Sequence, residues 1–323
     1  MKIKRMQAFL ALAVISLFAG ALPTALEAAP RNMVLGTAPV GTASFPYMVG
    51  VATIVNKAHP NEFALSPQET GGTVANIRLL DAGKVHLTGF SGMVVAEALE
   101  GKPPFTQKFN VQALFSMYGQ HFLWFALKSS GVTSWEQIAG KKMAVGTPAG
   151  STRVGGDLVI AAKGLKGKAQ FLYLQPSAMI DNMRDGRIDA GFGLVTGASP
   201  APWVQEVMSS LDVNFFGLDE PTIAKLVGEK PGLIRYVIPP GLLKGSPGFP
   251  TMSEYLIAGV SPKMDEQTAY LLTKTVQESM AELAKYSSAV KGGKPEDALK
   301  GLPPNLSFHP GAVRYFKEKG LIK

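Results

Sequence analysis

The chain has 323 residues, of which 46% are hydrophobic and 17% charged, and its formal net charge is +8. It contains no cysteine, which excludes disulfides, thiolate metal sites, iron–sulfur clusters and a cysteine nucleophile. Because the basic residues are scattered and form no Lys/Arg-rich run, the sequence predicts no nucleic-acid partner.

The N-terminus has the pattern of an export signal. Basic residues (Lys2, Lys4 and Arg5) precede an almost wholly apolar stretch that ends at Ala19. This pattern predicts a secretory signal peptide over residues 1–28, cut between about residues 21 and 28. The stretch is shorter than the roughly 20 residues needed to span a bilayer. The sequence therefore predicts a periplasmic protein that is free of the membrane after cleavage.

Strand and helix signals alternate in the next hundred residues. Short apolar runs predict strands at Met33–Leu35, Phe63–Ser66 and Val85–Thr88. Helical spacing predicts helices over Phe45–Lys57, from Thr70–Thr73 to about Leu80, and from Gly92 to Glu100. This order predicts an α/β fold with a mostly parallel sheet and helices on its faces.

A similar order recurs further along the chain. The predicted elements are a strand at Phe122–Lys128, a helix that begins with the capping box Thr133–Glu136, a strand at Lys142–Val145, helices from Gly150 and over Ala178–Arg184, a strand at Tyr255–Val260 and a helix over Asp265–Tyr286. The repeated layout predicts two lobes. Residues 29–128 would form lobe 1, residues 129–249 lobe 2, and residues 250–323 would return to complete lobe 1.

No assembled catalytic set is present. Gly146 and Gly150 lack the spacing and the lysine of a phosphate-binding loop, and Met93 stands where a nucleophile elbow needs its second glycine. The four histidines lie far apart and form no zinc-binding pair. The sequence therefore predicts a protein that is no enzyme, with no cofactor and no metal.

Two helix starts carry the candidate binding chemistry, Thr70–Thr73 and Gly150–Arg153. The first N–H groups of a helix lack internal partners, and glycine lets an anion approach them. Arg153 is expected to add a charged pair to a carboxylate. Plain N-capping remains the alternative at each start, and the nearby aromatic residues can equally belong to the core. The predicted ligand-binding residues are Ser44, Phe45, Thr70, Gly71, Gly72, Thr73, Phe90, Ser91, Gly150, Ser151, Thr152 and Arg153.

Several segments, in order along the chain, resemble the TAXI class of TRAP-transporter solute receptors. They are Thr70–Leu80, Gly140–Gly146 running into Gly150–Arg153, Asp185–Ala190 and His309–Gly320. The resemblance implies a type II periplasmic-binding-protein fold, with two α/β lobes around a ligand cleft. It also implies delivery of a small organic anion, carboxylate or amino-acid-like, to TRAP membrane permease subunits. The chain departs from the pattern at Gly89–Gly92, where the family often has polar residues with an aspartate.

Three functions remain open from the sequence. The first is a monomeric TRAP receptor. The second keeps the fold but serves an ATP-driven importer or the ligand domain of a sensor. The third is an exported enzyme of unknown chemistry, which the fold alone does not exclude.

Overall fold

The structure is a computed structural model that describes residues 29–323, so the predicted signal peptide lies outside the described residues. Its strands are β1 (Arg31–Gly36), β2 (Phe63–Gln68), β3 (Leu87–Ser91), β4 (Gln112–Leu127), β5 (Lys142–Gly146), β6 (Gln170–Tyr173), β7 (Ala190–Thr196), β8 (Ser199–Pro200), β9 (Val213–Phe216), β10 (Ile234–Ile238) and β11 (Phe249–Val260). Its α-helices are α2 (Ser44–Ala58), α3 (Thr73–Asp81), α4 (Gly92–Glu100), α5 (Ser151–Ala162), α6 (Pro176–Arg184), α7 (Pro202–Ser210), α8 (Glu220–Glu229), α9 (Glu266–Glu278), α10 (Met280–Leu283) and α11 (Pro310–Glu318).

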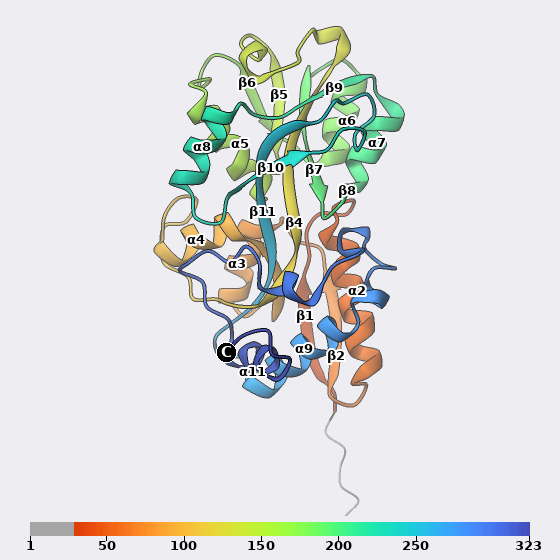
Figure 1. The fold of residues 1–323 in the computed structure, drawn as a ribbon, viewed down its shortest axis with the longest axis vertical. Coiled ribbons are helices and arrows are strands. Elements are labelled where there is room, and N and C mark those ends of the chain that lie inside the picture. The colour runs from red at the N-terminus through yellow and green to blue at the C-terminus, as the bar shows by residue number, and fades with distance from the viewer. Residues whose placement is uncertain (1–28) are drawn as a thin grey trace, which may run out of the picture.

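The predicted α/β fold with two lobes is confirmed (Figure 1). The strands form one sheet in the order β2-β1-β3-β11-β4-β7-β5-β6, with β10 beside β11, β8 beside β7 and β9 beside β4. The long strands β4 and β11 run through the middle of the molecule and belong to both lobes (Figure 1).

The sheet is less parallel than the sequence predicts. The pairs β1–β2 and β1–β3 are parallel in one lobe, and β5–β6 and β5–β7 are parallel in the other. Between them, β11 pairs antiparallel with β3 and β4, and β4 pairs antiparallel with β7. The difference arises because each long strand crosses from one lobe to the other, and the two crossings run in opposite directions.

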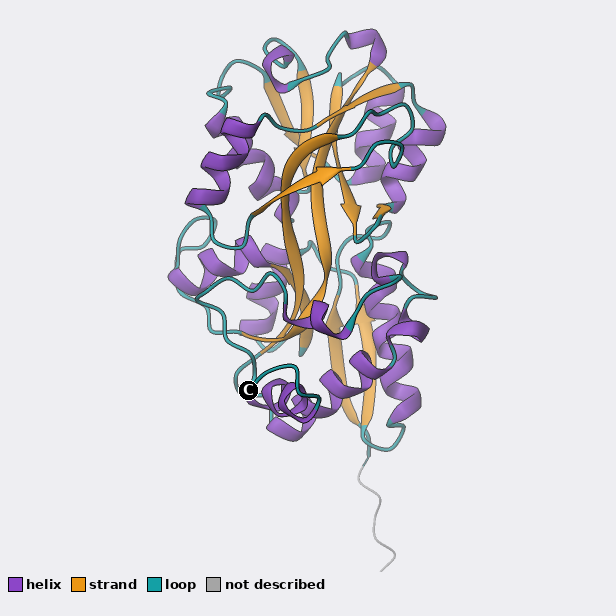
Figure 2. Ribbon diagram, viewed as in Figure 1, coloured by secondary structure: helices purple, strands orange, loops and turns teal. Residues whose placement is uncertain are grey.

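Helices cover both faces of the sheet in each lobe (Figure 2). One buried core joins the first helix and strands to the C-terminal helices, with Leu35, Met48, Leu272 and Phe316 all fully buried. A second core fills the other lobe and continues under α3 and α4. Residues from both ends of the described chain therefore pack in one core.

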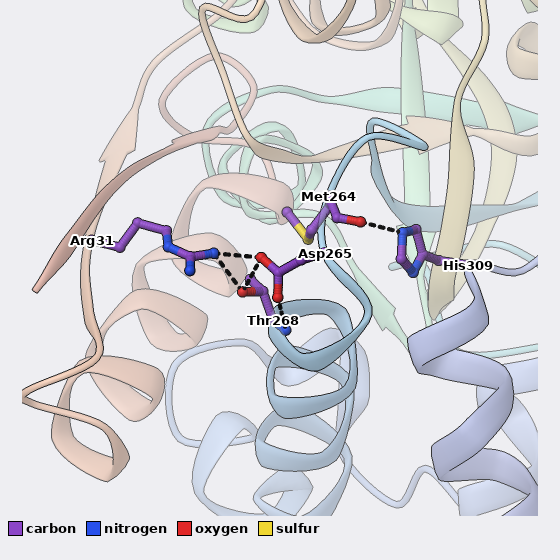
Figure 3. Close-up of polar contacts among 5 residues, drawn as sticks. All are labelled: Arg31, Met264, Asp265, Thr268 and His309. Carbon is purple, nitrogen blue, oxygen red and sulfur yellow. Dashed lines mark hydrogen bonds and ion pairs between the residues drawn. The ribbon is translucent and has the colours of Figure 1, made fainter.

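Polar contacts at the outer end of the first lobe join the start of β1 to the C-terminal helices (Figure 3). Arg31, the first residue of β1, donates to Asp265 and to Thr268, both at 2.6 Å. Asp265 also accepts from the Thr268 N–H and so caps α9. His309, the N-cap of α11, lies 2.9 Å from the Met264 carbonyl oxygen. These contacts tie the first strand to the last two long helices.

Two predicted helices differ from the structure. The capping box at Thr133–Glu136 begins only a 3-10 turn, Trp135–Gln137, and Ser134 makes no side-chain cap. The Gln137 side chain instead accepts from Thr133, which holds the segment as a turn before β5. The helix predicted over Asp265–Tyr286 is broken at Ser279, where α9 ends and the short α10 begins. Within residues 29–323, no helix is both long and apolar enough to cross a membrane.

Candidate functional site

A cavity of about 60 Å³ lies between the two lobes, at the carboxyl ends of the parallel strands. It is lined by Thr37, Ala38, Pro39, Thr42, Ala43, Ser44, Gly72, Thr73, Asn76, Gly89, Tyr118, Gln120, Thr147, Gly150, Ser151, Thr152, Pro176, Phe192, Leu194, Thr196, Trp203 and Leu256. Both lobes contribute to this wall. The location matches the general rule that open α/β sheets bind ligands beyond the carboxyl ends of their strands.

Five helices direct their first turns at this cavity. Helices α2, α3 and α5 contribute Ser44, Thr73 and Ser151, each the first residue of its helix. Helices α6 and α7 contribute Pro176 and Trp203 from their first turns. The positive end of each helix dipole therefore faces the same small space, which favours an anion there.

The N-caps differ between these helices and the others. None of α2, α3, α5, α6 and α7 has a side-chain hydrogen bond at its N-cap. By contrast, α4, α8, α9 and α11, which contribute nothing to the cavity, are capped by Ser91, Asp219, Asp265 and His309. Side-chain caps are thus absent on the five helices whose first turns line the cavity and present on α4, α8, α9 and α11, which do not line it.

Every side chain that lines the cavity is uncharged. Hydroxyl groups come from both lobes, among them Thr37 and Ser44 on one side and Thr147 and Thr196 on the other. The Asn76 amide donates to the carbonyls of Thr37 and Gly89, and its Oδ1 has no partner among the described residues. Apolar surface is supplied by Phe192, Leu194, Trp203 and Leu256. The cavity thus offers helix dipoles, hydroxyls and an amide acceptor beside an apolar wall.

The two lobes touch directly beside the cavity. The Val74 N–H donates to the Ala149 carbonyl at 3.0 Å, which joins the start of α3 to the loop before α5. Gly72 has a φ of +94°, and a Cβ added there would lie 3.3 Å from the Gly150 Cα. Further out, Lys230 forms an ion pair of 2.6 Å with the buried Glu97 of α4. The structure therefore shows the lobes in contact across the site.

One buried carboxyl stands directly behind the cavity wall, on β11. Glu254 is 0% exposed and accepts hydrogen bonds from the Ser91 hydroxyl, the Met93 N–H at 3.3 Å and the Gln120 amide at 3.5 Å. Burial raises the pKa of the Glu254 carboxyl to about 7, against the opposing hydrogen bonds from Ser91, Met93 and Ser151. At neutral pH this group is therefore close to its titration midpoint.

Half of the predicted ligand-binding residues lie at the cavity. They are Ser44, Gly72, Thr73, Gly150, Ser151 and Thr152. Residues of both predicted helix starts therefore line one cavity, and their binding of a ligand stays a prediction.

The other predicted residues lie outside the cavity wall. The Thr70 hydroxyl donates to the Thr37 carbonyl, and Gly71 faces Ala149 at the lobe contact. Phe90 is fully buried in the core, where its ring lies against Gly259. Phe45 belongs to the first turn of α2 but does not line the cavity.

Ser91 and Arg153 are engaged elsewhere. Ser91 caps α4 and donates to Glu254, so its hydroxyl is already committed. The side chain of Arg153 is 46% exposed, donates to the Pro148 carbonyl and pairs with Asp157 at 3.6 Å. Its guanidinium lies 4.5 Å from the centre of the Tyr173 ring. The structure therefore places Arg153 on an outer surface and not at the cavity.

Replacing Arg153 with alanine is accordingly expected to leave solute affinity almost unchanged, within about 0.5 kcal/mol, as for other surface changes. Ser151→Ala, which removes a hydroxyl from the cavity lining, is expected to cost about 0.5–1.5 kcal/mol of binding for one neutral hydrogen bond. Calorimetric titration of both variants checks the pair. A tenfold weaker affinity in Arg153→Ala would contradict this placement.

Sequence reasoning missed a symmetric pair of threonines. Thr37 and Thr147 each follow the glycine that ends the first strand of a lobe, and both line the cavity. The repeated Gly-Thr was visible in the sequence as a mark of the two lobes. No sequence pattern indicated Gln120, Tyr118 or Leu256, because their positions depend on where β4 and β11 cross. Among residues 29–323, no group of three or more metal-ligating side chains could hold a metal ion.

Comparison with known proteins identifies a matching family and solved structures of similar fold. The profile of the NMT1-like family matches residues 35–320. The substrate-binding protein of an amino acid ABC transporter aligns with a TM-score of 0.52 at 13% identity, covering 79% of this chain and 97% of that chain. A structure reported for glutathione import through the cystine ABC importer of Streptococcus mutans aligns with a TM-score of 0.52 at 14% identity, covering 83% and 99%.

These comparisons correct the predicted transporter class. The sequence favoured a TRAP receptor, but the family matched is NMT1-like and the similar structures are binding proteins of ABC transporters. The TRAP assignment is therefore wrong, and the comparisons favour the alternative, a binding protein of an ATP-driven importer. The segments that suggested the TAXI class include nearly all of α3 and the whole of α11.

Proposed function

The chain belongs to the NMT1-like family, and on that basis we propose that it is the solute-binding component of an ATP-driven importer for a small organic anion. One observation carries the ligand part of the proposal. The first turns of five helices, all without side-chain caps, converge on a single cavity between two lobes. Such an arrangement stabilises negative charge through backbone N–H groups and helix dipoles.

The lobes would open and close around the solute. We assign residues 29–128 and 250–323 to lobe 1 and residues 129–249 to lobe 2, so that β4 and β11 form the two connections. Hinge motion in these strands would separate Val74 from Ala149 and open the cavity. The contact between the lobes supports the assignment of this structure to the closed state.

The partners follow from the same role. The protein would act as a monomer outside the cytoplasm and deliver its solute to the membrane subunits of the importer. It would carry out no reaction, since its task is capture and release. The amino acid and cystine transporters to which the similar structures belong make carboxylate-bearing solutes the first class to test.

A thermal-shift panel tests the ligand class. The panel comprises the sodium salts of formate, acetate, pyruvate, succinate and sulfate, together with glycine, alanine, cystine and the cation choline. An anion at 100 times its dissociation constant is expected to stabilise the fold by about 2.7 kcal/mol. Choline is expected to give no shift. A panel in which no anion raises the melting temperature would contradict the proposed site.

Uptake measurements test the energy source. Membrane vesicles that contain the cognate permease are supplied with this protein and the labelled anion selected by the panel. Uptake is expected to require ATP on the cytoplasmic side and to survive collapse of the sodium gradient. Uptake that follows the sodium gradient in the absence of ATP would contradict the assignment to an ATP-driven importer.

A further inference from the structure

Glu254 lies where residues of the two lobes meet. Ser91 and the Met93 N–H belong to the end of β3 and the start of α4 in the first lobe. Ser151, whose side chain opposes the rise in the pKa of this carboxyl, is the first residue of α5 in the second lobe. Gln120 approaches from β4, one of the two strands shared by the lobes. The carboxyl therefore lies at the contact that forms when the two lobes close.

The same carboxyl is one side chain away from the cavity. Gln120 lines the cavity and donates to Glu254, and Ser151 lines the cavity and opposes the rise in the pKa of Glu254. Because every lining side chain is uncharged, no cation stands between a bound anion and this carboxyl. Two negative charges at such close range in a buried site repel each other strongly, and protonation of one of them relieves the repulsion.

We propose that capture of an anion in this cavity is coupled to the uptake of one proton from solvent by Glu254. The coupling rests on the proposed function, since it requires that the bound solute be an anion. In the solute-bound form Glu254 is a neutral carboxylic acid, so the second negative charge is removed from the site. The Met93 N–H continues to donate to the carboxyl. The solute keeps its own charge and remains held by the helix starts.

The charged and titratable groups on the surrounding elements are otherwise paired or neutral. On α4, Glu97 pairs with Lys230 at 2.6 Å, and on α5, Arg153 pairs with Asp157. On β4, burial lowers the pKa of His121 to about 4, so that side chain is neutral above pH 5. Burial raises the pKa of Tyr118 above its usual value, so this phenol stays protonated near neutral pH. Glu254, with its pKa raised to about 7, is the neighbour of the cavity that changes charge between pH 6 and pH 8.

Calorimetry tests the coupling without any substitution. The tightest-binding anion of the formate, acetate, pyruvate, succinate and sulfate panel is titrated into wild-type protein at pH 7. Bis-Tris, imidazole and Tris chloride buffers are used, because their cations differ in ionisation enthalpy and do not compete for an anion site. Uptake of about half a proton is expected at pH 7, together with a roughly tenfold loss of affinity between pH 6 and pH 8.

Two variants test whether Glu254 is the group that takes up the proton when the anion binds. Glu254→Gln is expected to bind the same anion with no proton uptake and with constant affinity between pH 6 and pH 8. Glu97→Gln, which neutralises the other buried carboxyl near the site, is expected to retain the wild-type uptake. Zero uptake with pH-independent affinity in the wild type, or proton release on binding, would overturn the coupling while leaving anion binding intact. Failure of every anion in the panel to bind would instead overturn the proposed function, and the coupling with it.

Discussion

Replacing Gly72 with valine is expected to weaken solute binding by about 1–3 kcal/mol, the usual cost of inserting side-chain atoms into a filled space. A Cβ at Gly72 would lie 3.3 Å from the Gly150 Cα in the opposite lobe, and the valine methyl groups would reach further. The substitution therefore holds the lobes apart and keeps the helix starts from surrounding the anion. Calorimetric titration measures the loss, and small-angle scattering should show that the variant no longer becomes more compact when the anion is added.

Gly83 provides the matched control for this substitution. It has a φ of +65° at the other end of α3, and a Cβ added there would meet no atom within 4 Å. Gly83→Val also places a β-branched side chain on a glycine of positive φ, while leaving the lobe contact free. Affinity is expected to stay near the wild-type value in this control. An equal loss of affinity in both variants would show that strain in α3, and not closure, governs binding.

The free energy of unfolding of the solute-free protein is expected to fall as the pH rises, because of Glu254. Burial raises its folded-state pKa from 4.5 to about 7, so the folded state holds the proton more tightly than the unfolded chain does. This contribution is favourable at low pH and is lost as the pH rises from about 4.5 through 7. The loss amounts to about 2–3 kcal/mol between pH 5 and pH 8.

Urea unfolding of the wild type and of Glu254→Gln at pH 5 and at pH 8 measures this effect. Since other groups titrate alike in both proteins, the variant is expected to gain about 2–3 kcal/mol relative to the wild type over this range. Glu97→Gln, measured in parallel, controls for the removal of another buried carboxyl. A constant difference between wild type and Glu254→Gln would mean that the buried carboxyl titrates as it does in the unfolded chain.

Local sequence patterns predicted the helices and strands that depend mainly on residues close together in the chain. The strand at Met33–Leu35, the helix over Phe45–Lys57 and the helix start at Gly150 all agree with the structure within a few residues. The strands β4 and β11 were predicted too short, at Phe122–Lys128 and Tyr255–Val260. Each continues through two environments as it crosses the lobes, so no single hydrophobic period marks its whole length.

Some residues at the candidate site could likewise be predicted from local sequence patterns, and others could not. Ser44, Thr73 and Ser151 were predicted from helix starts, which are a local signal, and all three line the cavity. Glu254 carried no signal of its own, since a lone glutamate in a strand becomes significant only when two lobes bury it. Arg153 misled the prediction for a related reason. A residue in the first turn of a helix can point into the cleft or away from it, and the rotation of α5 on its sheet decides which.

The position of β11 in the sheet also determines the order in which the molecule can assemble. Strand β3 pairs with β1 on one side and with β11 on the other, although the whole of the second lobe separates β3 from β11 along the chain. Until β11 arrives, the β1–β3 segment has an open edge and lacks the partners that α9 and α11 supply to its core. The first lobe to be synthesised is therefore the last to be completed. Such distant pairing slows folding, because the intervening loop must close before any contact stabilises it.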